Sequence, residues 1–172
     1  VGGSGVDRPR GGFVQFGTNP QQSKRAELLL EARRLINERA PEKAIKALQP
    51  LMTGGKNDPE ALYLAGVICE SIMRFADAAM YAKRSLDQLE HPEPLILLAR
   101  IERAQGKTDE AIRLCERAEK MSRPGMPYAR FAQIVRGGSL EEAGRFDEAR
   151  KVIEPLIKEA EASGQPAPPN LL

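Results

Sequence analysis

The chain has 172 residues, with 26 lysines and arginines against 24 aspartates and glutamates, so its formal charge is only +2. This balance argues against nucleic-acid binding, because proteins that bind a phosphate backbone carry a clear excess of basic residues. One histidine and two cysteines are too few for a disulfide framework or a His/Cys metal cluster, and no apolar run is long enough to span a membrane. The composition predicts a globular protein without metal or cofactor.

Three regions differ in composition. Residues 1–22 are rich in glycine and show no helical period, which predicts a flexible N-terminal tail. Residues 163–172 hold three prolines within four positions, and we expect a Pro-rich C-terminal tail there. Between them, residues 23–162 are rich in Ala, Leu, Glu, Lys and Arg, the strong helix formers, and are expected to form one helical domain.

Apolar residues in the central region recur at helical spacing, and glycine or proline interrupts the pattern at short intervals. No segment alternates as a strand would, so the predicted fold class is all-α. The spacing predicts eight helices, over residues 23–38, 42–53, 59–73, 75–89, 93–105, 108–121, 127–143 and 146–162.

An internal repeat runs through these helices. An anchor alanine recurs near the start of every second helix, at separations of 34, 33 and 38 residues; the four are Ala44, Ala78, Ala111 and Ala149. Twelve residues before each anchor stands another small residue, where two helices would cross closely; the four are Ala32, Gly66, Ala99 and Gly137. The longest separation carries about five extra residues, which we place in the turn at 121–127.

With this period of about 34 residues, and with motifs such as the Gly-Lys-Thr-Asp-Glu-Ala run at 106–111, residues 23–162 resemble the tetratricopeptide-repeat (TPR) family. The family's tryptophan at the fourth repeat position is missing, and its closing proline is displaced to Pro59, Pro92 and Pro124. The resemblance implies an all-α, right-handed α-solenoid of about four helix–turn–helix hairpins.

The resemblance also implies that the first helix of each hairpin lines a concave groove for a protein or peptide partner. The family's groove positions fall on Leu29, Arg33, Tyr63, Val67, Ile96, Arg100, Arg103, Phe131 and Ile134. Apolar anchors among three arginines suit an extended peptide with hydrophobic side chains and acidic groups. The alternative is that some of these residues pack internally and that the arginines are simply solvated. The clamp residues with which some TPRs capture chaperone C-termini are absent here.

Other residues were weighed for chemistry. His91 precedes a proline in a turn and is interpreted as a solvated histidine rather than a general base, since no partner can be assigned to it. Cys69 and Cys115 lie within predicted helices and are interpreted as buried thiols, with a disulfide or a reactive thiol as the alternative. In the N-terminal tail, Phe13 and Phe16 are candidates for docking into this chain's own groove or onto a neighbour, as against a tail without a binding role.

The sequence therefore predicts a non-enzymatic interaction module or scaffold. The alternatives are a recruitment or regulatory domain of a larger enzyme and an assembly subunit of a multiprotein complex; RNA binding by a related helical repeat is disfavoured by the near-neutral charge. No capping helix is expected after residue 162, so Val152, Ile153, Leu156 and Ile157 are expected to be partly exposed. Either Pro168, Leu171 and Leu172 of the C-terminal tail cover them or another subunit or domain does, which leaves a homo-oligomer or a larger complex open. A cytoplasmic location is the default, with an exported compartment as the alternative.

Overall fold

The computed structural model describes residues 19–164, which form eight α-helices joined by short turns, with no strand among them. The helices are α1 (Pro20–Asn37), α2 (Pro41–Met52), α3 (Pro59–Ser71), α4 (Phe75–Gln88), α5 (Pro92–Ala104), α6 (Thr108–Met121), α7 (Pro127–Glu142) and α8 (Phe146–Ala162). The predicted all-α class is confirmed. Phe13 and Phe16 lie outside the described residues, as does the segment 165–172.

Proline stands at the first position of α1, α2, α3, α5 and α7. There its missing N–H costs no helical hydrogen bond, and its fixed φ suits the helix. This position explains why Pro59 and Pro92 depart from the repeat pattern: they start helices. Helix α1 also begins at Pro20, three residues before the predicted start, because the Asn19 side chain accepts a hydrogen bond from the N–H of Gln21 at 3.0 Å and caps the helix.

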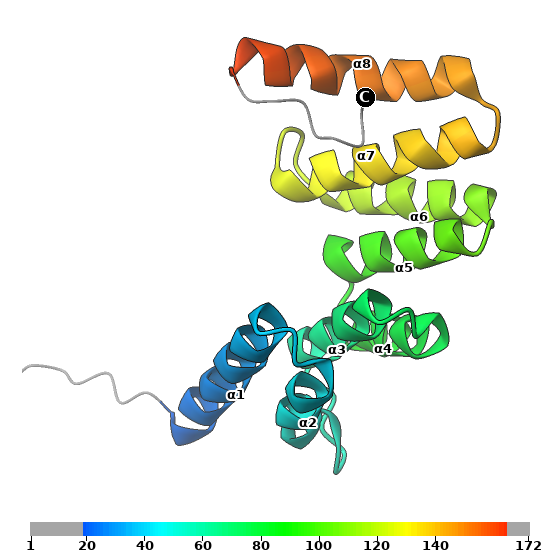
Figure 1. Cartoon of the computed structure of the whole chain (residues 1–172). Helices are drawn as coiled ribbons and strands as arrows, with labels where there is room; N and C mark the ends of the chain where they lie inside the picture. The colour runs from blue at the N-terminus through cyan, green and yellow to red at the C-terminus, as the bar shows by residue number, and fades with distance from the viewer. Residues whose placement is uncertain (1–18, 165–172) are drawn as a thin grey trace, which may run out of the picture.

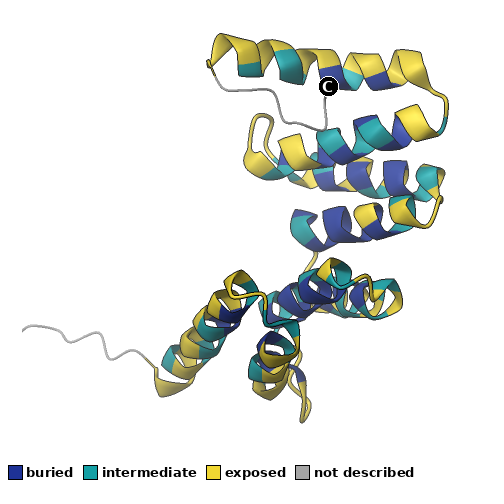
Figure 2. Cartoon of the chain, viewed as in Figure 1, coloured by how far each residue is buried: buried dark blue, intermediate teal, exposed yellow. Residues whose placement is uncertain are grey.

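The helices form four hairpins in chain order, and α5, α6, α7 and α8 lie one above another as a stack (Figure 1). We call α1, α3, α5 and α7 the first helices and the others the second helices. Buried residues concentrate on the first helices α3 and α5, whereas α8 is mostly exposed (Figure 2). The array of four hairpins therefore has a buried middle and more open ends.

The small residues predicted at the helix crossings lie at close contacts. Ala32 and Ala99 are fully buried. A Cβ atom on Gly66 would lie 3.2 Å from the carbonyl oxygen of Ala78 on α4 and 2.9 Å from Cδ2 of Leu97 on α5, and one on Gly137 would lie 2.6 Å from Cγ1 of Ile153 on α8. These distances leave no room for a larger side chain, which is the physical reason for the repeated small residue.

The extra residues between Ala111 and Ala149 are not all in the turn at 121–127, where we expected them. The turn 122–126 is only two residues longer than the turn 89–91 between α4 and α5. The remaining extra residues lie in α7, which has 16 residues where α5 has 13. The prediction that the turn holds them all was wrong. The extra length lies at the N-terminal end of α7, and it carries Tyr128 to the ring of His91, 5.5 Å away between centroids.

Candidate protein-binding face

The predicted groove residues lie on the first helices, and we call the surface that these helices present the first-helix face. Phe131 is 59% exposed there, and Tyr63, Val67 and Ile134 are half-buried. Two other predicted anchors are in the core, since Leu29 and Ile96 are only 6% and 7% exposed. The apolar part of this face is therefore smaller than the sequence predicted.

At the N-terminal end of the array, arginines of α1 reach carboxylates at the start of α3. Arg33 pairs with Glu60 at 2.7 Å, and Arg25 pairs with the same carboxylate at 2.9 Å and with Asp58. Asp58 caps α3 by accepting a hydrogen bond from the N–H of Ala61 at 3.0 Å. Burial raises the pKa of Asp58, but the Arg25 guanidinium and the Ala61 N–H outweigh that effect, so its pKa is lowered.

The other two predicted arginines are also paired between first helices. Arg100 of α5 contacts Glu70 of α3 at 2.7 Å, and Arg103 of α5 contacts Glu142 of α7 at 2.7 Å. Burial raises the pKa of Glu70, and the charge of Arg100 opposes this shift. The Arg103 guanidinium lies over Gly138, where an added Cβ would be 2.6 Å from its Nη1. Gly138 thus provides the space in which this guanidinium lies.

These ion pairs reduce the net positive charge expected on the first-helix face. Each arginine that was expected to attract an acidic partner already has a carboxylate of this chain beside it. A guanidinium has five N–H donors, and one carboxylate engages only part of them. Since the three side chains stay 52%, 51% and 35% exposed, the remaining donors are available for neutral acceptors such as peptide carbonyl oxygens.

A cluster of ring side chains lies where α5 begins. His91 caps α5, with its Nδ1 accepting a hydrogen bond from the N–H of Glu93 at 3.4 Å, and Tyr128 meets its ring edge-on. A recess of about 230 Å³ beside it is lined in part by Tyr63, His91 and Glu93. Burial raises the pKa of Tyr63 to about 12, and the charge of Glu93 raises that of Tyr128. Both phenols therefore stay protonated and can donate hydrogen bonds.

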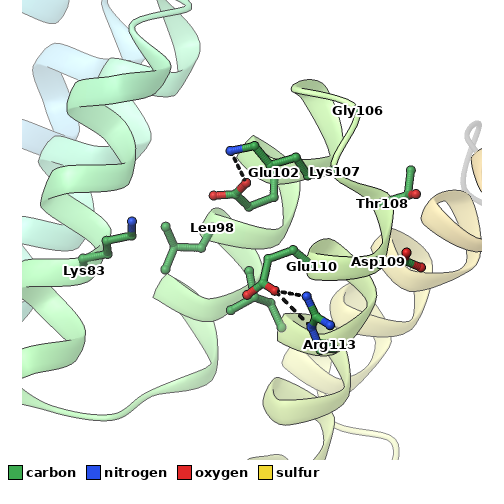
Figure 3. A pocket seen from close by; sticks show the side chains of 10 residues that line it. Lys83, Leu98, Glu102, Gly106, Lys107, Thr108, Asp109, Glu110 and Arg113 are labelled. Carbon is green, nitrogen blue, oxygen red and sulfur yellow. Dashed lines mark hydrogen bonds and ion pairs between the residues drawn. The ribbon is translucent and has the colours of Figure 1, made fainter.

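A second recess, of about 600 Å³, lies between α4 and the α5–α6 hairpin (Figure 3). Leu98 is an apolar part of its wall, and four of its charged groups pair with one another. Lys107 contacts Glu102 at 3.1 Å, and Arg113 contacts Glu110 at 2.5 Å. Ion pairs of this kind are typical of a solvated surface, so this recess is a weaker candidate than the first-helix face.

Both cysteines are free and fully buried, as predicted. Between residues 19 and 164, no group of three His, Cys, Asp or Glu side chains is placed to hold a metal ion. In the same part of the chain, no helix combines the length and the apolar character needed to cross a membrane.

The sequence analysis missed the carboxylate partners and Tyr128. Glu60, Glu70 and Glu142 lie 27 to 39 residues from their arginines, so local pattern gives no sign of the pairing. The repeat register did contain a signal. Glu60 and Glu93 stand at one register position, six residues before the crossing residue, on the helices that carry the predicted groove.

Comparison with known proteins agrees with the repeat assignment. Residues 96–166 match the sequence model of a tetratricopeptide-repeat family, which confirms the resemblance for that part of the chain. A crystal structure of MamA protein is similar with a TM-score of 0.68 at 21% identity, covering 84% of this chain and 78% of that chain. A second MamA crystal structure gives 0.69 at 20% identity, covering 84% and 86%. A MamA RS-1 ArsTM double mutant gives 0.64 at 17% identity, covering 76% and 72%. None of the curated proteins compared with the chain matches it.

Proposed function

Because this chain carries tetratricopeptide repeats on a solenoid of helical hairpins, we propose that it is an interaction scaffold that binds an extended peptide, or a segment of a partner subunit, along the first-helix face. Tetratricopeptide repeats support a protein-interaction role in general and are typically non-catalytic modules. The side chains gathered on this face, which are ion-paired arginines, phenols and apolar groups, are suited to binding an extended chain.

The observation that carries the proposal is the exposed ring of Phe131. It stands six residues before the crossing residue Gly137, the register position that Glu60 and Glu93 occupy on α3 and α5. A large apolar side chain at 59% exposure, on a helix whose other large apolar side chains are buried or half-buried, is a natural anchor point for a partner. Burying such a ring contributes about 1.5–3 kcal/mol.

Polar groups of the same face would then hold the peptide backbone. Arg100 and Arg103 are fixed by their carboxylate partners and still present N–H donors, and the Tyr63 phenol stays protonated. Since the charges of both arginines are compensated, the preferred peptide is one with apolar side chains and accessible carbonyl oxygens rather than a strongly acidic one.

A peptide library displayed on phage, selected against the purified protein, tests this proposal. The enriched peptide is synthesised, and its affinity is measured by fluorescence anisotropy for the wild type, Phe131→Ala and Phe146→Ala. Phe146 is the matched control, because it is 64% exposed but begins α8, a second helix.

We expect Phe131→Ala to weaken binding about 10- to 100-fold, which corresponds to the burial of one ring, and Phe146→Ala to change it less than about twofold, since that ring lies off the face. Equal losses in both variants, or no loss in Phe131→Ala, would place the binding surface elsewhere. Failure to enrich any peptide would contradict peptide binding itself.

A further inference from the structure

Three helices begin with a proline followed by a glutamate, and the three carboxylates have different partners. They are Glu42 of α2, Glu60 of α3 and Glu93 of α5. Two arginines of the preceding first helix hold Glu60, Arg25 at 2.9 Å and Arg33 at 2.7 Å. Glu93 stands at the same register position of the next first helix. In the part of the chain that the structure describes, its carboxylate pairs with no lysine or arginine.

The repeat register explains why Glu93 has no arginine beside it. The two arginines that hold Glu60 stand seven residues before and one residue after the crossing residue of their own repeat. In the next repeat, whose crossing residue is Gly66, these two places are Pro59 and Val67. Neither of these side chains carries a charge or a hydrogen-bond donor. Helix α3 therefore offers Glu93 no counterpart of the arginines with which α1 holds Glu60.

The other neighbours of Glu93 leave its charge uncompensated. The Nδ1 atom of His91 lies 3.3 Å from the carboxylate, but the same atom accepts a hydrogen bond from the N–H of Glu93. A ring nitrogen that accepts a hydrogen bond carries no proton, so the neutral ring does not balance the charge. Arg33 and Arg100 already pair with other carboxylates. Since the Glu93 side chain is 32% exposed, a cation from outside the chain can reach it.

Two phenol rings lie near this carboxylate. Tyr63 of α3 lines the same recess of about 230 Å³ as Glu93, and Tyr128 of α7 meets the ring of His91 edge-on. The charge of Glu93 is the main cause that raises the pKa of Tyr128, and it adds to burial in raising the pKa of Tyr63. Aromatic rings and carboxylates both attract ammonium and guanidinium groups. Three successive first helices thus bring together the groups that bind a cation.

We propose that Glu93, together with Tyr63 and Tyr128, binds a basic side chain, lysine or arginine, of the peptide partner. We call these three residues the cation subsite. The cation of the peptide then does for the carboxylate of α5 what the arginines of α1 do for the carboxylate of α3. This inference rests on the proposed function, because the basic side chain belongs to the peptide that is anchored at Phe131.

The place of the cation subsite determines where the basic residue stands in the peptide. Glu93 and Phe131 share one register position on α5 and α7, two helices that are in contact. The axes of packed helices lie about 8–10 Å apart, and an extended chain advances about 3.3 Å per residue. The basic residue is therefore expected about three positions from the apolar residue that contacts Phe131.

The peptide selected against the purified protein tests the cation subsite. We expect it to carry lysine or arginine at this spacing, and Glu93→Gln to weaken its binding about 3- to 10-fold, as for a partly exposed ion pair with a cation–π contact. Replacing the basic residue by its neutral analogue, norleucine for lysine or citrulline for arginine, should weaken binding equally with the wild type and not at all with Glu93→Gln. Glu42→Gln is the matched control and should leave the affinity unchanged, because it removes the same charge from the same position of a second helix.

The outcomes separate this inference from the proposed function. A selected peptide that depends on Phe131 but not on Glu93, or that carries no basic residue, would overturn the cation subsite and leave the proposed function intact.

An NMR titration of the ¹⁵N-labelled protein with N-acetyl-lysine methylamide tests the cation subsite even if no peptide is selected. We expect saturable shifts of the amides of residues 91–94 in the wild type and in Glu42→Gln, and none in Glu93→Gln. The norleucine analogue, which has the apolar stem without the charge, should give no such shifts. Equal shifts with both compounds, or no shifts with the lysine compound, would overturn the cation subsite.

Discussion

Gly137 is the position where one added methyl group should have the clearest effect on stability. It lies buried in α7 where α8 crosses, and a Cβ there would be 2.6 Å from Cγ1 and 2.7 Å from Cδ1 of Ile153. Cγ1 is directly attached to a branched Cβ, so it cannot swing away as the end of a flexible side chain would. Gly137→Ala must therefore separate the two helices locally.

The size of the effect follows from two opposing contributions. Overpacking a core contact costs about 1–3 kcal/mol, and this contact belongs in the upper half of that range. Replacing glycine by alanine within a helix stabilises the folded state by about 1 kcal/mol, because alanine has the higher helix propensity. We therefore expect Gly137→Ala to lower the free energy of unfolding by about 1–2 kcal/mol. In a domain of this size that corresponds to a decrease in Tm of roughly 2–8 °C.

The adjacent Gly138 is the matched control. A Cβ there would meet only the guanidinium of Arg103, which can move at the expense of a solvent-facing ion pair with Glu142 worth at most about 1 kcal/mol. Gly138→Ala should therefore be neutral or slightly stabilising. Circular dichroism at 222 nm during urea and thermal unfolding measures both variants. Equal stability of Gly137→Ala and the wild type would refute the close-crossing argument, as would a failure of Ile153→Ala to lessen the effect of Gly137→Ala.

Two further predictions concern ionisable groups. Because the pKa of Asp58 is lower in the folded protein than its unfolded value of about 3.9, its charge stabilises the fold above that value, and this contribution is lost as the pH falls through the folded pKa. The stability difference between wild type and Asp58→Asn in urea unfolding should therefore shrink between pH 5 and pH 2 (roughly the range of this titration), and a constant difference would contradict this. Burial raises the pKa of Cys115 to about 12 and also raises that of Cys69. A thiol reagent at about pH 8 should thus react with neither in the native protein and with both in denaturant, and rapid native reaction would disprove their burial.

The helices and their repeat register are determined locally. Helix formers in periodic runs and prolines at helix starts act within one helix, and the small residue at each crossing recurs at a fixed place in the repeat, so a single sequence contains enough to predict them. The same register correctly marked Phe131 as a surface position of α7. It also marked Leu29 and Ile96, which the structure buries, because whether a side chain at that position is covered depends on how the neighbouring helix packs.

The chemistry of the face was decided only by the tertiary structure. The sequence analysis treated Arg33 and Arg100 as unpaired cations. In the structure, Glu60 lies 2.7 Å from Arg33 and Glu70 lies 2.7 Å from Arg100, because consecutive first helices lie next to each other. Similarly, the extension of α7 brings Tyr128 to a ring on the preceding first helix. The sequence by itself determined the hairpins, since each hydrogen bond and turn forms between near neighbours. The charge and shape of the binding face arise from contacts between residues about 30 positions apart, as the repeat period requires, and these contacts exist only once the hairpins have stacked.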